Sequence, residues 1–596
     1  MAEILMRAAL LMLSFFGLCG AVRTGLKLNR FLAPYVTASG IILVLMAAGM
    51  LGVLKYGAWA LYMAGWLGCG AMLLRRRKPD AVLIVLAAAF VVWLGWQLGV
   101  CKSWHNDDFS HWAQAAESLA RRDAFPDVSE RLIAFQSYPM GATVFIYYAT
   151  RFVGDGEGVR FVAQNFLCGL LVLTLFAHVK GRKKIMVPVT AVAAVFLYKF
   201  NRNFQELQVD WLLSYFGIAI ASAVLFYRND AKKMLTAALP GIAAVTLVKS
   251  SGMFFAVVCG VIAMMVLRQN GASKKRLTWT GIAVFAVPVI AFVLWTAHVK
   301  LSFPAALDSK HAVSASAYAA NAGAKSLRMI LGTAVRMALK WLRFEYVEIF
   351  AVLFAAFCWL LVRMMRKERP KAAAALGKYL LGCLGVFALW LVMLYAMYIF
   401  SMPAGETHRL ASYERYMSSG LLFPLGIAVI GLIGCFSDES LNLSAPVRRF
   451  AAAALAVCIV TAPLANGYGQ YLACFGRWNT GYPEMRAKVI SMCDAYGLEP
   501  GGSYIGFAGT TDDLRRAYNV MKYDLASADV AVISRAEDGG YRCTRLAGNE
   551  PIDDLTAWLN ERYEETEHLL VFAESEEFDV ALAAADVSDG WTLRLP

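Results

Sequence analysis

Long apolar stretches fill most of the first 470 residues of the chain. Most of them approach or reach the roughly 17–25 residues that a helix needs to cross a bilayer. Fourteen such segments lie near residues 4–22, 33–54, 57–74, 81–100, 160–178, 185–200, 211–227, 234–248, 252–267, 278–297, 348–365, 376–400, 416–435 and 450–468. The pattern predicts an α-helical polytopic membrane protein with about 14 spans, formed by residues 1–470.

A different pattern follows in residues 471–596. Short strand-like and helix-like pieces alternate there: EMRAKVISMCDAYG, SYIGFAG, DVAVISR, PIDDLTAWLNERYE, HLLVFAES and EEFDVALAAA. Alternation of this kind is typical of a small α/β domain. The segment contains no glycine-rich nucleotide fingerprint and no P-loop. We therefore expect an accessory or acceptor-binding role for this domain rather than the chemistry itself.

Composition separates the same two parts. The chain is 59% hydrophobic and 17% charged, which excludes a soluble enzyme of this length. Residues 1–470 carry 46 Lys and Arg against 21 Asp and Glu, whereas residues 471–596 carry 11 against 22. Because basic residues in a membrane protein mostly report topology, the positive net charge does not call for a nucleic-acid partner.

Basic clusters follow alternate apolar segments, as the positive-inside rule requires of cytoplasmic loops. They are Arg23 to Arg30, Arg75 to Lys78, Lys180 to Lys184, Arg228 to Lys233, Arg268 to Arg276, Arg363 to Lys371, and Arg448 with Arg449. The rule predicts a multi-pass protein of the bacterial cytoplasmic membrane with both termini and the C-terminal domain extracytoplasmic. Segment 138–153 must then be re-entrant or interfacial. Outer loops 101–159 and 298–347 lie on the side of the C-terminal domain.

The loop 101–159 contains an acidic pair, Asp107 and Asp108. Asn106 or Asp107 is a suitable N-cap, and the residues that follow alternate apolar and polar at helical spacing, which predicts an amphipathic helix on the membrane surface. One interpretation is that the two carboxylates only cap this helix. The other is catalytic, because adjacent carboxylates repel each other and desolvation raises the pKa of at least one of them.

The motif DDFSHWA at 107–113, with YPMG at 138–141, resembles a known set of sequences. It resembles the GT-C superfamily of membrane glycosyltransferases, which includes protein mannosyltransferases, aminoarabinose transferases and arabinosyltransferases. More closely, it is similar to bacterial multispan proteins with D-[DE]-[FY]-S-H-W and Y-P-P-G, although Met140 replaces the second proline. The resemblance implies a GT-C-like fold, a polyprenyl-phosphate sugar donor, and a loop carboxylate, Asp107 or Asp108, that activates the acceptor or holds a metal.

Cations in the outer loops are candidate ligands of the donor phosphate. Segment 325–346 places Arg336, Lys340 and Arg343 on one side of a predicted basic amphipathic helix. Arginine is the better bidentate phosphate ligand, whereas attraction to anionic lipid headgroups is the alternative explanation of this helix.

Three further cations stand near the ends of spans. Lys249 lies in a tight turn with Ser250 and Ser251, and Arg409 and Arg415 precede a span. We expect all three to bind the donor phosphate together with Arg336, and the alternatives are a snorkelling lysine and simple interface anchoring.

Four residues are assigned to supporting the acceptor: His111, Tyr138, Arg202 and Glu206. For the last two, the alternative is an internal salt-bridge network with Asp210, because the three are spaced at i, i+4 and i+8. Pro139 predicts a bend before the re-entrant segment. Its aromatic side chains, Phe145, Tyr147 and Tyr148, either line the path of the donor isoprenoid or anchor the segment in the interface.

No cofactor follows with certainty. A divalent metal held by Asp107, Asp108, His111 and His408 is left open, although two histidines six residues apart do not share a helical face. The twelve cysteines form no zinc-like cluster, and Cys474, Cys493 and Cys543 leave room for at most one disulfide in the C-terminal domain.

Together these features predict an inverting glycosyltransferase of GT-C type that serves cell-envelope glycan synthesis. It would move a sugar from a polyprenyl-phosphate donor to a glycan, lipid or protein acceptor on the outer face of the membrane, with Asp107 or Asp108 as the base. A polysaccharide polymerase or ligase that uses polyprenyl-diphosphate glycans is one alternative, and a lipid or glycan transporter is the other.

Overall fold

The computed structural model describes residues 2–76, 80–200, 202–303, 315–342, 346–465, 484–510, 514–545 and 548–596. The helices of the first part are α1 (Ala2–Gly25), α2 (Ala33–Met50), α3 (Leu54–Leu74), α4 (Ala81–Leu98), α5 (Ala113–Arg122), α6 (Gly141–Val153), α7 (Glu157–Val172), α8 (Lys183–Lys199), α9 (Asp210–Phe226), α10 (Ala231–Val248), α11 (Gly252–Gln269), α12 (Lys274–Ser302), α13 (Ala315–Gly323), α14 (Leu327–Leu342), α15 (Tyr346–Glu368), α16 (Pro370–Phe400), α17 (Ala404–Arg409), α18 (Tyr413–Ser437) and α19 (Ala445–Ala465). A π-helical turn, Asp108–Trp112, precedes α5, and a 3-10 turn, Leu173–His178, extends α7.

The chain is a multi-pass membrane protein. Eleven helices in the described residues are long and apolar enough to cross a membrane, and α9 is a shorter apolar helix of 17 residues. Helices α8 and α19 occupy two further predicted places, so a helix lies at each of the fourteen apolar segments. The prediction of an α-helical polytopic protein is confirmed.

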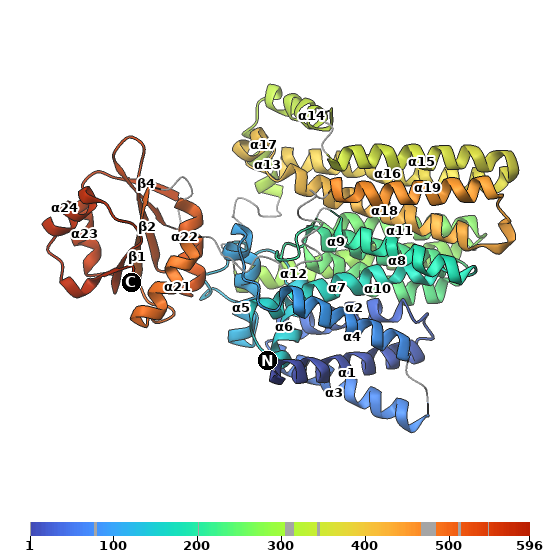
Figure 1. Cartoon of the computed structure of the whole chain (residues 1–596), viewed down its shortest axis with the longest axis horizontal. Coiled ribbons are helices and arrows are strands. Elements are labelled where there is room, and N and C mark those ends of the chain that lie inside the picture. The colour runs from blue at the N-terminus through green and yellow to red at the C-terminus, as the bar shows by residue number, and fades with distance from the viewer. Residues whose placement is uncertain are drawn as a thin grey trace.

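The helices of the bundle run side by side in layers (Figure 1). Helices α15, α16 and α19 form one side, and α1 and α3 form the other, while α9 lies between them and buries nearly all of its side chains. Close approach of α1 and α3 requires small residues at their crossing. A side chain at Gly17 would collide with the backbone carbonyl of Gly65, as expected for membrane helices that pack through glycine.

Segment 138–153 is a bend followed by the short helix α6. Its 13 residues are too few to span a bilayer, and most of its side chains are buried. Phe145, Tyr147 and Tyr148 are at most 5% exposed, and Tyr147 donates a hydrogen bond to Asp123. They are therefore part of the core and do not line an open path, contrary to the isoprenoid path predicted along them.

The C-terminal part is a small α/β domain, as predicted. Its elements are α21 (Glu484–Tyr496), β1 (Tyr504–Thr510), α22 (Leu514–Asp524), β2 (Val530–Arg535), β3 (Tyr541–Arg545), β4 (Gly548–Ile552), α23 (Leu555–Tyr563), β5 (His568–Val571), α24 (Glu576–Ala584) and β6 (Thr592–Arg594). The six-stranded sheet has the order β4-β3-β2-β1-β5-β6, in which β1 is parallel to β2 and β5, and β2, β3 and β4 are antiparallel. The predicted domain boundary at 470/471 and Cys474 lie outside the described residues.

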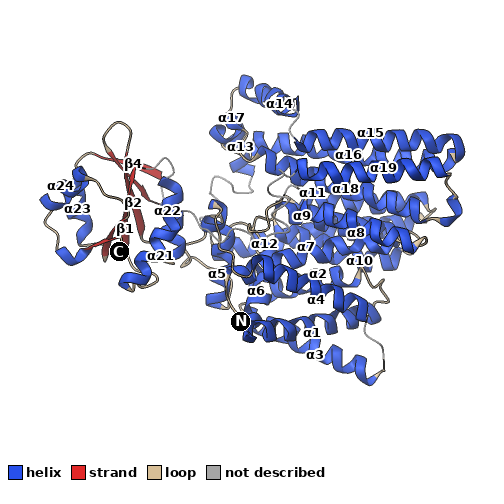
Figure 2. Cartoon of the chain, in the orientation of Figure 1, coloured by secondary structure: helices blue, strands red, loops and turns tan. Residues whose placement is uncertain are grey.

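The sheet is covered on both faces (Figure 2). Because side chains alternate along a strand, Ile505 and Phe507 of β1 pack with α23 and α24, whereas Tyr504 packs with α21 and α22. Cys493 and Cys543 are free thiols. Helices α21 and α22 face the membrane bundle, and α5 lies between the bundle and the domain (Figure 1).

Candidate functional site

Four charged side chains from distant parts of the chain form a chain of ion pairs. The Arg415 guanidinium lies 2.7 Å from a carboxylate oxygen of Asp107 and 3.3 Å from one of Asp210. The second oxygen of Asp210 accepts a hydrogen bond of 2.8 Å from Lys249. Asp210 is the first residue of α9, where the positive end of the helix dipole favours a carboxylate.

Helix ends bring these groups together. Lys249 follows the last residue of α10 and Arg415 lies in the first turn of α18, so both cations are carried on rigid elements. Although burial alone would lower it, the nearby Asp210 carboxylate raises the pKa of Lys249, which is therefore fully charged. Its ammonium also faces the rings of Tyr138 and Tyr416 at 5.8 and 5.5 Å.

The two adjacent aspartates have different surroundings. The Asp107 side chain is 34% exposed, and Gln208 donates a hydrogen bond of 3.2 Å to the same oxygen that Arg415 contacts. Asp108 is fully buried and accepts a hydrogen bond of 3.1 Å from the backbone N–H of Leu207. Burial, followed by the charge of Glu206, raises the pKa of Asp108 well above its usual range.

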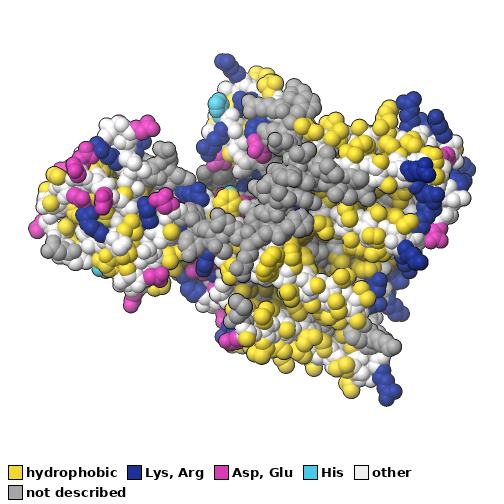
Figure 3. Space-filling view, viewed as in Figure 1, with side chains coloured by type: hydrophobic (Ala, Val, Ile, Leu, Met, Phe, Trp, Pro, Cys, Tyr) yellow, Lys and Arg dark blue, Asp and Glu magenta, His cyan; other side chains and the backbone are white. Residues whose placement is uncertain are grey.

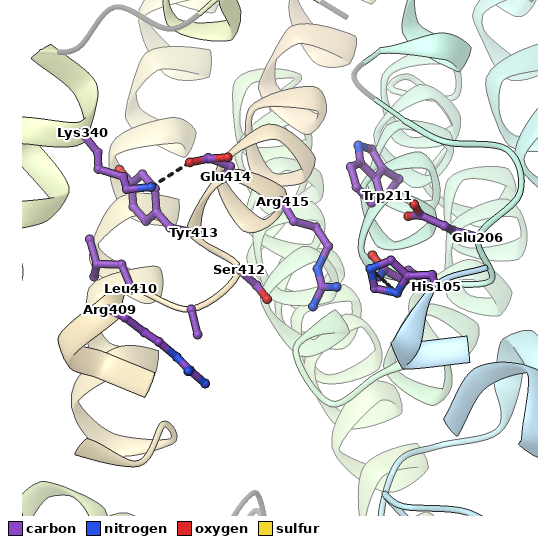
Figure 4. A pocket seen from close by; sticks show the side chains of 12 residues that line it. His105, Glu206, Trp211, Lys340, Arg409, Leu410, Ser412, Tyr413, Glu414 and Arg415 are labelled. Carbon is purple, nitrogen blue, oxygen red and sulfur yellow. Dashed lines mark hydrogen bonds and ion pairs between the residues drawn. The ribbon is translucent and has the colours of Figure 1, made fainter. Parts of the chain in front are cut away.

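A pocket of ≈ 480 Å³ opens beside Arg415 (Figure 4). One wall carries His105, Glu206, Gln208 and Trp211, and the opposite wall carries Lys340 and residues 409–415. The guanidinium groups of Arg409 and Arg415 point into the space between the walls. This volume lies within the range of small-molecule sites.

Glu206 is the acidic group on the wall of the pocket opposite Arg415. Burial raises the pKa of Glu206 to about 7, and the Arg415 guanidinium opposes the rise. The indole N–H of Trp211, on the same wall, has no hydrogen-bond partner among the described residues. The wall thus offers a titrating carboxyl to a bound molecule.

Three of the predicted phosphate ligands lie at the site and Arg336 does not. Lys249 and Arg415 belong to the ion-pair chain, and Arg409 lines the pocket. Arg336 does not line the pocket, and its guanidinium bonds instead to Thr333 one turn before it on α14. Arg343 lies outside the described residues.

The apolar side of α14 is exposed, as expected of an interfacial helix. Leu327, Leu331, Val335 and Leu339 are between 53% and 71% exposed. Lys340, near its C-terminal end, reaches the pocket wall and forms an ion pair of 2.7 Å with Glu414. Only one end of the helix therefore contributes to the site.

His111 and Tyr138 lie together behind the ion pairs. Their rings meet edge to face at 5.3 Å, and burial lowers the pKa of His111 to about 3, so the imidazole is neutral. Burial raises the pKa of Tyr138 to about 12. Both support the wall from within and do not reach the pocket.

Arg202 is 3% exposed and donates a hydrogen bond of 2.6 Å to Asn165. Its guanidinium lies among the rings of Tyr198, Phe204 and Tyr215. The predicted salt-bridge network of Arg202, Glu206 and Asp210 is wrong. The segment 202–209 is not helical, so the i, i+4 spacing does not bring these side chains together, and Asp210 pairs with Lys249 and Arg415 instead.

The described residues hold no group of three or more His, Cys, Asp and Glu side chains arranged to bind a metal. The four candidate ligands do not converge: Asp107 contacts Arg415, Asp108 accepts from Leu207, and His111 is enclosed by Trp112, Phe135 and Tyr138. His408 lies exposed on α17. This donor set does not fit a divalent ion.

The predicted amphipathic helix is formed by the π-helical turn and α5, but it is packed within the protein and does not lie on the membrane surface. Its polar side chains Gln114 and Ser118 are as buried as Phe109 and Leu119 on the apolar face, at most 1% exposed. Gln114 donates to the backbone carbonyl of Lys522 in α22 of the C-terminal domain, and Ser118 donates to the carboxylate of Glu130. Polar side chains on one face of a helix predict contact with water, whereas Gln114 and Ser118 contact other parts of the protein.

Sequence reasoning missed several members of the site. Gln208, which bonds His105 at 2.9 Å, gave no signal beyond its polarity in an outer loop. Asp210 had a signal, since an acidic residue begins an otherwise apolar helix. The contacts that the C-terminal domain makes with the loop before Asp107 had no signal in the sequence.

The chain was compared with protein families, curated proteins and solved structures. The chain matches no known protein family and no curated protein. Among solved structures it is similar to ArnT from Cupriavidus metallidurans bound to undecaprenyl phosphate, with a TM-score of 0.41 and 14% identity. The match covers 77% of this chain and 94% of that one.

Proposed function

We propose that the protein is an inverting membrane glycosyltransferase of GT-C type. It transfers a sugar from a polyprenyl-phosphate donor to a hydroxyl of a glycan, lipid or protein acceptor. The observation that carries the proposal is the Asp107–Arg415–Asp210–Lys249 ion-pair chain beside the pocket. It supplies a carboxylate base and phosphate-binding cations in one place, which are the groups that glycosyl transfer with inversion requires.

The transfer involves one bond formed and one broken at the anomeric carbon. The acceptor hydroxyl oxygen attacks that carbon from the face opposite the phosphate, and the bond from the carbon to the phosphate oxygen breaks. The electron pair of this bond leaves with the polyprenyl phosphate, whose growing negative charge is stabilised by Arg415 and Arg409. The hydroxyl proton passes to the carboxylate of Asp107.

Asp107 suits the role of base better than Asp108. Asp107 is partly exposed next to the pocket, whereas Asp108 is fully buried and accepts a hydrogen bond from the backbone N–H of Leu207. We assign Asp108 to fixing the 200–209 loop against the π-helical turn. The π-helical turn is what allows two adjacent carboxylates to serve different partners, in keeping with the frequent use of such turns at functional sites.

Donor binding also has a built-in consequence for the base. In the free protein Arg415 is shared by Asp107 and Asp210. A donor phosphate that takes the Nη1 side of the guanidinium displaces Asp107, while Asp210 still holds the Nε side. The Asp107 carboxylate thereby becomes available for the acceptor proton only when donor is present.

The isoprenoid tail needs an apolar surface near the same helix. A groove of ≈ 440 Å³ along α8, α15, α18 and α19 is lined almost wholly by apolar side chains, among them Leu425, Val429 and Ile433 of α18. Leu425 is ten residues beyond Arg415, or about 15 Å along the helix. We assign the tail to this groove in place of the buried aromatic side chains of α6.

The charge distribution supports an outward-facing site in the bacterial cytoplasmic membrane. Lys and Arg side chains gather at the end of the bundle opposite the α/β domain (Figure 3). By the positive-inside rule we assign that end to the cytoplasm, and the pocket, both termini and the C-terminal domain to the outer side.

The test is transfer from labelled polyprenyl-phosphate sugars by the full-length chain in reconstituted vesicles. Loss of transfer in Asp107→Asn, with unchanged thermal stability, supports the proposal. Transfer that survives in this variant would remove Asp107 from the mechanism. Release of a lipid diphosphate instead of a monophosphate would identify a polymerase or ligase, and uptake of the labelled lipid without any transfer would identify a transporter.

A further inference from the structure

The C-terminal domain contacts the segment that carries Asp107. Helices α21 and α22 face the bundle, and α22 lies against the π-helical turn Asp108–Trp112 (Figure 1). The other helices of the domain, α23 and α24, cover the opposite face of the sheet. The side of the domain that carries α21 and α22 therefore faces the segment that carries Asp107.

The domain bonds three of the four residues that precede Asp107. Arg486 donates to the carbonyl of Ser103 at 2.9 Å, and Arg516 donates to the carbonyl of Trp104 at 2.9 Å. The amide of Asn519, which is 4% exposed, donates to the side-chain oxygen of Asn106 at 2.8 Å. These bonds hold the backbone at Ser103 and Trp104 and the side chain of Asn106, the residue that precedes Asp107.

A buried charge network fixes the domain itself to the bundle. Arg486 forms ion pairs of 2.8 Å with both Glu157 of α7 and Asp524 of α22, and all three side chains are at most 10% exposed. Buried pairs of this kind add little net stability but are costly to break, so they specify one docking geometry. Arg160 of α7 adds a bond of 3.1 Å to the hydroxyl of Tyr523.

We infer that the C-terminal domain positions the Asp107 carboxylate, and that Asn519 is the positioning residue nearest to it. Asp107 meets Arg415 through a single carboxylate oxygen, so a small displacement of its backbone breaks the contact. Asn519 and Arg516 remove that freedom by holding Asn106 and Trp104. The inference rests on the proposed function for its catalytic consequence, whereas its structural consequence is measured without activity.

A simple tether would look different. A domain attached only for proximity to an acceptor has no need to bond residues one and three positions before the base. Here Arg516 and Asn519 of α22 make those bonds. Gln114, in the helix that follows the acidic pair, donates to the backbone carbonyl of Lys522. The contacts therefore bracket the acidic pair from both sides.

The test compares Asn519→Ala with a matched control, Asn560→Ala, in the full-length protein. Asn560 is an exposed asparagine of α23 whose side chain accepts one hydrogen bond, from the backbone of Asp586. Hydrogen–deuterium exchange of the peptide covering 103–112 reports the local geometry, and kcat and KM for the labelled donor report its consequence. Asn106→Ala and the Asn106→Ala/Asn519→Ala pair complete a double-mutant cycle.

We expect Asn519→Ala to speed exchange in 103–112 and to lower kcat by about fivefold to tenfold, the equivalent of one neutral hydrogen bond, with the donor KM unchanged. Asn560→Ala changes neither quantity, and the double variant is no worse than either single one. A wild-type kcat in Asn519→Ala overturns the inference and leaves the proposed function standing. Absence of transfer by the wild-type chain overturns the proposed function and with it the catalytic role of Asn519, whatever exchange shows.

Discussion

The guanidinium of Arg415 lies 2.7 Å from the carboxylate of Asp107, across 308 residues of sequence. The same guanidinium reaches Asp210, so one side chain joins an outer loop to the start of a buried helix. Neither contact follows from local sequence. Together they define where a donor phosphate and a proton acceptor would meet.

Substitution of each of the two adjacent aspartates by asparagine should have very different effects on the transfer rate. Asp107→Asn removes the proposed base and should lower kcat by about 100-fold to 10,000-fold. Asp108→Asn should keep more than about half of the wild-type rate, because an amide oxygen can accept the hydrogen bond from the Leu207 N–H as the carboxyl oxygen does. Steady-state transfer assays on both variants decide the matter, and equal losses in the two would contradict the division of roles.

Asp210 should matter for stability as well as for the site. Asp210→Asn leaves Lys249 and Arg415 buried without their shared counter-charge, which should cost about 3–5 kcal/mol and lower Tm. The exposed Asp553→Asn is the control and should leave Tm unchanged. Adding Lys249→Met to Asp210→Asn should restore much of the Tm but not transfer, because a proposed phosphate ligand is lost. A restored transfer rate would exclude Lys249 from donor binding.

Donor binding should weaken as pH rises through the pKa of Glu206. This carboxyl is neutral below its pKa of about 7 and negative above it, so at higher pH it repels the donor phosphate. The donor itself is a phosphodiester and does not titrate in this range. We expect its KM to rise about threefold to tenfold between about pH 6 and about pH 8, and to stay level in Glu206→Gln. A KM that falls with pH would reverse the assigned sign.

Two arginines of the same predicted class should differ. Arg409 lines the pocket, and Arg336 bonds within its own helix away from the pocket. Arg409→Ala should raise the donor KM by about threefold to tenfold, the value of one exposed charge contact, whereas Arg336→Ala should leave it within about twofold. If Arg336→Ala has the larger effect on KM, the phosphate binds at α14 and not in the pocket.

The sequence predicted features that depend on local pattern. Apolar length located the fourteen helices, and period-two and helical spacing located six of the ten elements of the α/β domain. The acidic pair and Arg415 were identified because charge in an outer loop of an apolar protein stands out. The bend at Pro139 was also predicted, and a side chain at the next glycine, Gly141, would collide with the carbonyl of Leu247, two residues before Lys249.

Features that depend on distant contacts were missed or misjudged. The polarity of Gln114 and Ser118 predicted water around the helix, but Gln114 bonds Lys522 of α22, about 400 residues later, and Ser118 bonds Glu130. Arg336 looked like a phosphate ligand because it shares a helix face with Lys340, yet only Lys340 reaches the pocket. Helical spacing joined Arg202, Glu206 and Asp210 only because the segment was assumed to be helical.

The contact of α22 with the loop before Asp107 also joins segments that are synthesised at very different times. Asn519 is made 413 residues after Asn106, which at ribosomal rates of about 5–20 residues per second is a delay on the order of 20 to 80 seconds. A chain that stops before α22 already contains every residue that lines the pocket, since the last of these is Arg415. Such a chain lacks the bonds that hold Trp104 and Asn106. The bonds from Arg516 and Asn519 can therefore form only after α22 has been made, so the loop that carries Asp107 gains its full set of contacts late in synthesis.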